Sequence, residues 1–248
     1  MKSLFIFAIL FVTNMVQAIE FSAYRIYLDR ENRAEQFTIF NESEKDEVCT
    51  LKTRHHEYQE DGTVSIWQGL TPPDNSALKL MRFSPKKFTI PAGSRQVVNF
   101  SKRRKANIKD GEFQAILSIN CKTDSVNSVN RAVNLVANIV HNIPIIVREG
   151  KLTGTIDIKS AQVNKQDTSK IDVLFEPNGN RSFYGELTFQ NESGEVLTKL
   201  PYVSLHMGVK TKVFNIDLPK TLKDEKLWLV FKEYSNFGGN ITTKFQYN

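Results

Sequence analysis

Side chains that could bind a metal or catalyse a reaction are few in this chain of 248 residues. The only cluster of potential metal ligands is His55-His56-Glu57, and neighbouring residues of a strand point to opposite faces, so the two histidines could not readily share an ion. His141 and His206 stand alone, and no Ser/His/Asp signature, Cys/His signature or glycine-rich phosphate loop is present. The sequence therefore predicts neither an enzyme nor a metal site, and it indicates no cofactor and no small-molecule substrate.

Positive charge is the other chemical feature of the chain. The formal net charge is +6, and the run Lys102, Arg103, Arg104 and Lys105 places four cations side by side. Acidic residues are dispersed throughout, so a solvated surface explains the excess of Lys and Arg, and nucleic acid is not an expected partner.

Residues 1–18 have the pattern of a secretory signal peptide. Lys2 precedes an apolar run from Leu4 to Val12, and Val16-Gln17-Ala18 supplies a small-residue cleavage site. That run is shorter than the roughly 20 residues that a membrane-spanning helix needs, so a retained anchor is the less favoured alternative. We expect an exported, soluble protein that begins at Ile19 and has a net charge of +5, because Lys2 is the one charge removed from +6.

Alternation of apolar and polar residues predicts that the rest of the chain is built from strands. After residue 18 no run of apolar residues has convincing helical spacing, and period-two segments recur between turns such as Asn41-Glu42-Ser43 and Pro177-Asn178-Gly179-Asn180. About seven strands fit residues 19–148 and about six or seven fit 151–248, near the number in an immunoglobulin-like sandwich. The clearest alternating sets are Phe37 and Ile39; Phe113, Ala115, Leu117 and Ile119; Ile171, Val173 and Phe175; Phe214, Ile216 and Leu218; Leu227, Leu229 and Phe231; and Phe245 and Tyr247.

The predicted fold class is therefore all-β, with two immunoglobulin-like β-sandwich domains in tandem. The polar run Arg148-Glu149-Gly150-Lys151 is the best boundary, which gives domains of residues 19–149 and 150–248. Two cysteines are too few for a disulfide-stapled scaffold, but in an oxidising compartment they could form one bridge. Sandwich topology places Cys49 and Cys121 on the third and sixth strands of the first domain, which are neighbours in one sheet, and we predict a disulfide between them.

Four segments, in this order behind the signal sequence, resemble the periplasmic chaperones that assemble pili, the PapD type. Residues 82–113 are the most informative, because a serine-proline pair, the turn Pro91-Ala92-Gly93 and the basic run recur there in the order typical of that family. The four segments are Arg25 with the strand from Phe37 to Asn41 that follows it; residues 82–113; residues 131–150, RAVNLVANIVHNIPIIVREG; and residues 179–185, GNRSFYG.

The resemblance implies two sandwich domains in a boomerang arrangement and a function in pilus, or fimbrium, assembly. Such a protein is not an enzyme: in the periplasm it binds unfinished pilin subunits, shields their open groove by donor-strand complementation and delivers them to an outer-membrane usher. The alternative is a secreted adhesion or structural protein with two immunoglobulin-like domains.

The resemblance also implies a role for Arg25 in the cleft between the two domains, where it would grip the C-terminal carboxylate of a pilin. A guanidinium suits this role, because its planar fork makes two charge-assisted bonds to one carboxylate. Aligned on Arg148, the lysine that usually assists this arginine falls at Pro144, which indicates a divergent branch of the chaperone–usher system. The weaker candidates for the missing charge are Arg82, Arg148 and the Lys102–Lys105 run, including Arg103 and Arg104.

Residues 131–148 are apolar on both sides of a predicted strand. Two interpretations fit: a central strand of a sandwich, or the donor strand that lends alternating side chains to a pilin while backbone hydrogen bonds hold the pair together. Together with the other segments, the donor interpretation is favoured. The side chains that would enter the pilin groove are Val133, Leu135, Ala137 and Ile139, with Val136 and Val140 adding apolar surface on the other side.

Overall fold

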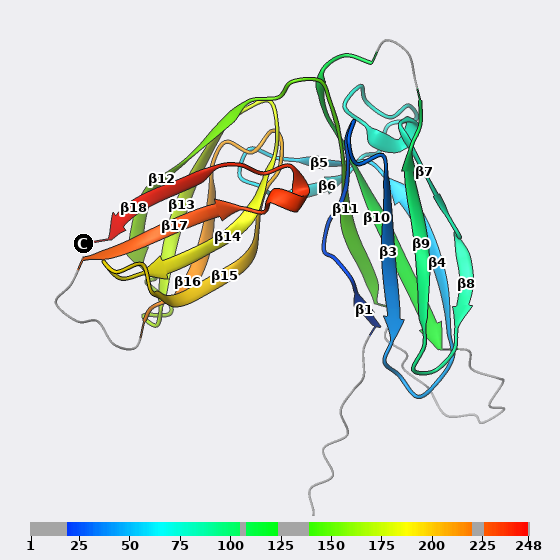
Figure 1. The fold of residues 1–248 in the computed structure, drawn as a ribbon, viewed down its shortest axis with the longest axis horizontal. Coiled ribbons are helices and arrows are strands. Elements are labelled where there is room, and N and C mark those ends of the chain that lie inside the picture. Colours follow the sequence, from blue (N-terminus) through cyan, green and yellow to red (C-terminus); the bar gives the residue numbers. More distant parts are fainter. Residues whose placement is uncertain (1–18, 105–107, 124–138, 220–225, 248) are drawn as a thin grey trace, which may run out of the picture.

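The computed structural model describes residues 19–104, 108–123, 139–219 and 226–247. In these ranges the chain consists of strands, loops and two short 3-10 turns, η1 (Ala77–Lys79) and η2 (Ser235–Phe237). The strands form two layered bodies joined by one linker, which confirms the all-β prediction of two sandwiches in tandem (Figure 1). Among the described residues, no helix is long and apolar enough to cross a membrane. The predicted signal peptide, Lys105 and the donor-strand residues Val133, Leu135 and Ala137 lie outside these ranges.

The N-terminal sandwich has two sheets with the core between them. The four-stranded sheet has the order β1 (Ile19–Phe21), β3 (Ala34–Asn41), β9 (Arg95–Lys102), β7 (Met81–Ser84). The five-stranded sheet has the order β2 (Ile26–Leu28), β11 (Val140–Glu149), β10 (Gly111–Thr123), β4 (Glu47–Arg54), β8 (Lys87–Ile90). The alternating residues that predicted these strands face the core: Phe37, Ile39, Leu117 and Ile119 are each 0% exposed.

The first strand of this sandwich changes sheets. β1 pairs antiparallel with β3, whereas β2 pairs parallel with residues Ile145–Val147 of β11. Arg25 lies in the crossing segment, immediately before β2, and not within the opening strand as the sequence indicated. This crossing brings Arg25 to the side of the five-stranded sheet that meets the second sandwich.

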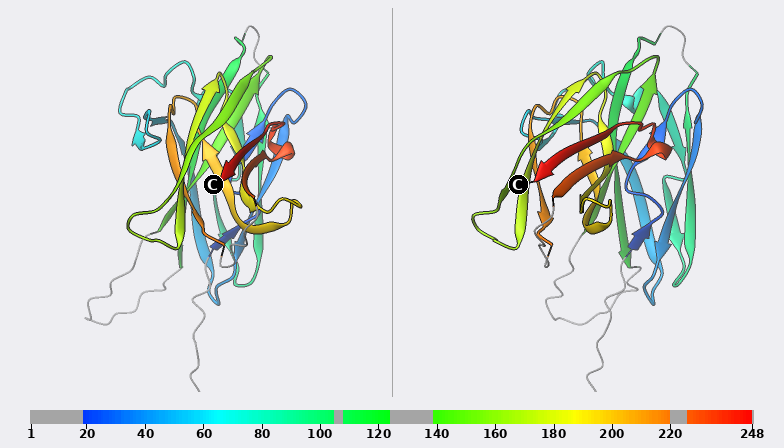
Figure 2. Two further views of the ribbon diagram at one scale, coloured as in Figure 1. Left: turned by 90° about the vertical axis from the view of Figure 1, so that its left-hand side faces the viewer. Right: turned by 60° about the vertical axis from the view of Figure 1, so that its left-hand side comes forward.

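The C-terminal sandwich has a three-stranded and a four-stranded sheet (Figures 1 and 2). Their orders are β12 (Gly154–Val163), β13 (Lys170–Gly179), β16 (Lys212–Asp217), and β15 (Val196–Leu205), β14 (Phe183–Gln190), β17 (Leu227–Glu233), β18 (Thr242–Tyr247). One sequence prediction is wrong here. Pro177 does not begin a turn, because β13 continues through it to Gly179 and pairs Pro177 with Ile156. β16 pairs with β13 only from Lys170 to Phe175, so Pro177 has a neighbouring strand on one side only, a position at which proline is tolerated.

The disulfide prediction is confirmed, with Cys49 and Cys121 bonded between β4 and β10. These strands are neighbours in one sheet, as expected, although the first half of the chain contains more strands than the seven predicted. The additional ones arise from the divided first strand and from a hairpin of β5 (His56–Tyr58) and β6 (Val64–Ile66), which belongs to neither sandwich sheet. In Figure 1 this hairpin lies between the two bodies.

Candidate functional site: the surface between the two sandwiches

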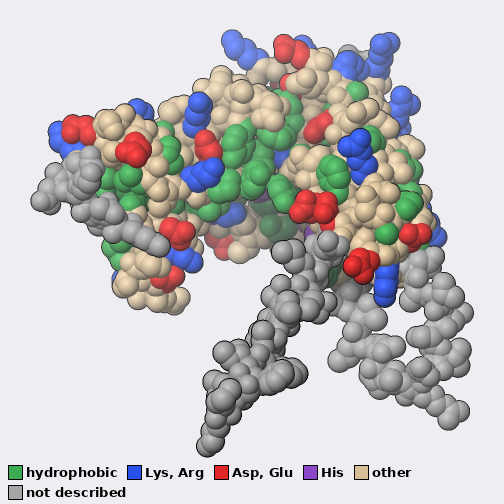
Figure 3. Space-filling view, turned by 60° about the horizontal axis from the view of Figure 1, so that its bottom comes forward, with side chains coloured by type: hydrophobic (Ala, Val, Ile, Leu, Met, Phe, Trp, Pro, Cys, Tyr) green, Lys and Arg blue, Asp and Glu red, His purple; other side chains and the backbone are tan. Residues whose placement is uncertain are grey.

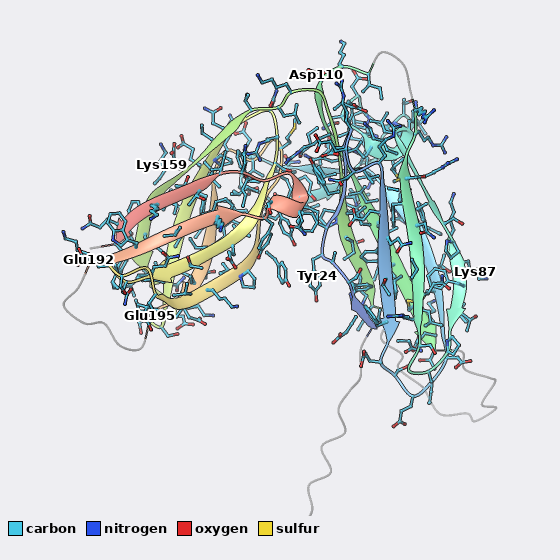
Figure 4. All side chains as sticks on the ribbon, in the orientation of Figure 1. Tyr24, Lys87, Asp110, Lys159, Glu192 and Glu195 are labelled. Atoms are coloured by element: carbon cyan, nitrogen blue, oxygen red, sulfur yellow. A yellow bond between two sulfur atoms is a disulfide. The ribbon has the colours of Figure 1, made fainter. Side chains whose placement is uncertain are left out.

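The start of the linker between the sandwiches is held against the N-terminal sandwich by Asp110. β11 ends at Glu149 and β12 begins at Gly154. Gly150 has φ +70°, and a Cβ there would lie 1.7 Å from Oδ1 of Asp110, so the position requires glycine. The Lys151 N–H donates to Oδ2 of Asp110 at 3.2 Å, and Figure 4 shows Asp110 beside the linker. The start of the linker therefore has a defined conformation.

Arg25 is buried where the two bodies meet. Its side chain donates from Nη2 to Ser204 Oγ at 2.6 Å and from Nη1 to Ser182 Oγ at 3.3 Å, and both serines belong to the C-terminal sandwich. The guanidinium carbon lies 4.3 Å from the ring centroid of Tyr184. Burial lowers the pKa of Arg25 to about 10, partly offset by the charge of Glu112, so the side chain is cationic at neutral pH. At 1% exposure Arg25 is not the surface residue that a lone arginine would suggest.

The backbone of Ser182, in the C-terminal sandwich, forms hydrogen bonds with two side chains of the N-terminal sandwich. Its backbone N–H donates to Oε2 of Glu112 at 2.9 Å, and its carbonyl accepts from Nη2 of Arg148 at 2.8 Å. Glu112 and Arg148 are paired across β10 and β11, and Arg148 Nε donates to Glu112 Oε2 at 2.9 Å. Both side chains are buried, so their mutual charge compensation is essential to this contact.

A second contact is formed by the β5–β6 hairpin. The ring of Tyr58 stacks on His206 of the C-terminal sandwich, with centroids 3.7 Å apart and planes at 8°. His206 Nε2 lies 3.1 Å from Ser204 Oγ, the hydroxyl that Arg25 contacts. Residues 55–57 lead into the hairpin that packs against the other sandwich, and His55 is 4% exposed, so this segment is not a solvated surface strand.

Aromatic side chains line the same surface. Tyr24 of the first sandwich lies 5.0 Å from Tyr202 of the second, measured between ring centroids, and these two rings are 49% and 54% exposed. Tyr202 has φ +61°, which is unusual for a residue with a side chain and occurs where β15 is irregular opposite β14. Figure 4 shows Tyr24 pointing into the space between the bodies, and Figure 3 shows hydrophobic side chains gathered in that hollow.

The other predicted anchor residues separate into two groups. Arg148 lies beside Arg25, but its three donor nitrogens are occupied by Glu112, Gly238 and Ser182. Arg82 and Arg103 lie on the far side of the first sandwich, where they donate to Ser101 and to the Met81 carbonyl. The described part of the Lys102–Lys105 run, to which Arg103 belongs, is also not a uniform basic loop. Arg104 is exposed, whereas Lys102 is buried and forms an ion pair with Glu149.

The exposed end of β11 is the other part of the candidate site. β10 pairs with β11 from Val140 to Glu149, but on the opposite side β2 covers only Ile145–Val147. Among the described residues, no strand pairs with the β2-side edge of β11 from Val140 to Pro144. Ile139 and Val140 at its start are 62% and 43% exposed, while Ile143 and Ile145 face the core. Pro144, at the position of the expected lysine, pairs with Ile116 and adds no charge.

Sequence reasoning missed the residues that complete the contact: Tyr58, Glu112, Ser182, Ser204 and His206. Glu112 could have been inferred, since pairing of the two long strands places it opposite Arg148. Ser182 lies in residues 179–185, which carry part of the family resemblance, but no role was assigned to it. The other three have no signal in the sequence, because their partners come from the other sandwich. The described residues contain no group of three or more His, Cys, Asp or Glu side chains that could hold a metal ion.

Comparison with known proteins gives likenesses of fold at low sequence identity. No family model matches the chain, and no curated protein matches it. A solved structure of the CsuC–CsuE chaperone–tip adhesion subunit pre-assembly complex from archaic chaperone–usher Csu pili of Acinetobacter baumannii is similar, with 13% identity, a TM-score of 0.49, and coverage of 92% of this chain and 97% of that one.

Two further structures are similar to the same degree. The Escherichia coli chaperone DraB has 12% identity and a TM-score of 0.46, with 94% and 96% of the two chains covered. The Salmonella enterica SafA pilin in complex with the SafB chaperone has 14% identity and a TM-score of 0.43, with 94% and 96% covered. None of these scores reaches one half, so we base no functional conclusion on them.

Proposed function

We propose that the protein is a periplasmic chaperone for pilin subunits, which completes the unfinished sheet of a subunit with its own strand. The observation that supports this most directly is the uncovered edge of β11 between Val140 and Pro144, preceded by the exposed apolar side chain of Ile139. An edge with free backbone groups and protruding apolar residues binds another extended chain readily. In this proposal residues 131–139, with Val133, Leu135, Ala137 and Ile139, extend the pairing edge into the subunit.

Arg25 is the proposed partner of the subunit's terminal carboxylate. Its Nε has no hydrogen-bond partner among the described residues, and its two remaining nitrogens contact neutral serine hydroxyls and not a carboxylate. A carboxylate would be a stronger acceptor than these hydroxyls. Because Arg25 is 1% exposed, binding requires the carboxylate to displace Ser182 from Nη1, while the shorter hydrogen bond from Nη2 to Ser204 stays in place. Arg148 has a supporting role, since Glu112 already neutralises it.

The sequence supports the proposed location in the periplasm. Residues 1–18 have the signal-peptide pattern, which directs the chain out of the cytoplasm, and the compartment must be oxidising enough for the Cys49–Cys121 bond. Delivery of bound subunits to an outer-membrane usher follows from the family resemblance. We propose residues 19–149 and 150–248 as the two domains. In this function the chain uses binding energy from strand pairing and performs no reaction.

The test is co-purification of subunits with the Ile139→Asp variant from periplasm in which pilin genes from the same locus are expressed. An aspartate at this exposed position should change the free energy of unfolding by less than about 0.5 kcal/mol. It should reduce the subunit recovered at least about tenfold, because an unpaired charge would enter an apolar groove.

Val213→Asp is the matched control, since Val213 is 51% exposed but lies on β16 of the other sandwich. That variant should melt and bind as the wild type does. A lowered melting temperature for Ile139→Asp with normal subunit recovery would mean that the edge is part of a core. If the wild-type protein recovers no small β-sandwich subunit, the alternative of a secreted two-domain adhesion or structural protein is favoured.

A further inference from the structure

The β5–β6 hairpin is attached to the C-terminal sandwich at its tip. The carbonyl of Glu60 accepts from the backbone N–H groups of Lys210 and Thr211 at 2.8 and 3.2 Å. The side chains of Glu60 and Lys210 also form an ion pair at 2.6 Å, but both are about 70% exposed, so this pair adds little. The two backbone hydrogen bonds make the attachment directional, as in a short sheet contact.

Packing of Tyr58, the last residue of β5 before the turn, makes a second attachment. Tyr58 is half-buried against the hydrophobic core of the C-terminal sandwich, although it belongs by sequence to the first half of the chain. Its ring covers the imidazole of His206 in a parallel stack. Gly62 in the hairpin turn leaves room for Lys212, whose Cδ would lie 2.8 Å from a Cβ at that position. The hairpin therefore contacts the loop between β15 and β16, at His206, Lys210 and Thr211, and the start of β16 at Lys212.

A chain of polar contacts leads from this packing to Arg25. Arg25 donates to Ser204 Oγ, and a hydroxyl that accepts this bond can donate its own proton to Nε2 of His206. In that arrangement Nε2 is the unprotonated nitrogen of a neutral imidazole and the proton is on Nδ1, which is buried and has no hydrogen-bond partner among the described residues. Burial, together with the charge of Arg25, holds the pKa of His206 well below its usual value, which agrees with a neutral ring. Tyr58 fixes the plane of that ring by stacking.

We infer that the β5–β6 hairpin is a brace that sets the relative orientation of the two sandwiches, and that Tyr58, His206 and Ser204 are positioning residues for the Arg25 guanidinium. The brace holds the C-terminal sandwich at a fixed distance from the N-terminal one. The three positioning residues orient Nη2 of Arg25 before any ligand arrives. The brace stands on contacts within this chain, whereas the positioning role rests on the proposed function, since it matters only if Arg25 binds a carboxylate.

The brace is tested by a distance measurement that needs no ligand. Spin labels attached to Lys87→Cys and Glu192→Cys would report the separation of the sandwiches, since both positions are exposed and lie at opposite ends of the molecule (Figure 4). The labelled protein with Tyr58 unchanged should give one narrow distance distribution. The labelled Tyr58→Phe variant, which keeps the stacked ring, should do the same. Tyr58→Leu should give a distribution at least about twice as broad, with the Cys49–Cys121 bond intact. An unchanged distribution in Tyr58→Leu would overturn the brace.

The positioning role is tested with a peptide that has the C-terminal sequence of a pilin from the same locus, in free-carboxylate and amidated forms. Ser204→Ala and His206→Phe should weaken binding of the free carboxylate about tenfold, the effect of one lost hydrogen bond near a charge, and should leave the amide unaffected. His206→Phe keeps a ring for Tyr58 to stack on, so its distance distribution should stay narrow.

Equal losses for the carboxylate and the amide would show that Ser204 and His206 act only on the fold, and would overturn the positioning role. If the wild-type protein binds both peptides equally well, Arg25 is not the anchor and the positioning role is wrong with it. That result would leave the brace to be decided by the distances alone.

Discussion

The carboxylate of Glu112 in the N-terminal sandwich accepts a hydrogen bond from the backbone N–H of Ser182 in the C-terminal sandwich, at 2.9 Å, and the same oxygen accepts from Arg148. One buried acid thus joins the two bodies and neutralises a buried arginine. Arg25 lies on the other side of Ser182 and is influenced by the charge of Glu112 as well. The contact between the sandwiches is accordingly electrostatic at its centre and aromatic around it.

Removal of the Glu112 charge should destabilise the protein strongly. Glu112→Ala should lower the free energy of unfolding by about 3–5 kcal/mol, because Arg148 would remain buried without a counter-charge. Glu112→Gln should lose less, since its amide oxygen can still accept from Ser182. Urea unfolding followed by intrinsic fluorescence measures both variants. A loss below about 1 kcal/mol in the alanine variant is the size expected for an exposed ion pair, and it would contradict the role of Glu112 as a buried counter-charge.

Arg25→Ala should weaken carboxylate binding by about 2–5 kcal/mol, as expected when one partner of a desolvated charge pair is removed. Arg25→Lys should recover only part of this loss, because a lysine cannot reach two acceptors with one planar group. Calorimetric titration with the free-carboxylate peptide measures the difference, with the amidated peptide as control. Full binding by Arg25→Ala would place the anchor elsewhere. The alanine variant should also unfold more easily, because Ser182 and Ser204 lose their donor.

Glu35 should make the protein less stable as the pH rises. Burial raises the pKa of this carboxyl to about 7, although its oxygen accepts from the Tyr27 N–H at 2.6 Å. A folded-state pKa above the unfolded value of 4.5 means that the folded protein binds the proton more tightly, so stability falls between about pH 4.5 and 7.

Glu35→Gln should therefore be more stable than wild type at pH 8, by about 1–2 kcal/mol after allowance for the partial exposure of the side chain. The two proteins should have equal stability near pH 4. Urea midpoints over this pH range provide the measurement, and a constant difference at every pH would refute the assignment to Glu35.

The disulfide should contribute measurably to stability. The double variant Cys49→Ala/Cys121→Ala removes a link between residues 72 apart in sequence and should lose about 2–4 kcal/mol of unfolding free energy. Mass spectrometry of the exported wild-type protein should find no free thiol. Two free thiols in that sample would disagree with the bonded pair.

The sequence by itself determined much of the local structure. Alternation places Phe37, Ile39 and Leu229 in buried positions, because a strand with one face in a core repeats every second residue, and all three are 0% exposed. The pairing of Cys49 with Cys121 followed from the same logic, since sandwich topology makes their strands neighbours. Arg25 was selected by resemblance, and its placement between the sandwiches needed coordinates.

Only the tertiary structure decided how the two sandwiches meet. The partners of Arg25 and Tyr58 are Ser204 and His206, which lie about 150 or more residues away along the chain and have no periodicity that links them to the first sandwich. In the sequence, the hairpin of residues 56–66 looks like an ordinary polar turn. The residues of a turn do not specify which surface the turn covers, so its contact with the C-terminal sandwich could not be predicted. A strand pattern reports which residues avoid water, whereas the contact between two finished sandwiches depends on the shape and charge of surfaces that exist only after each has folded.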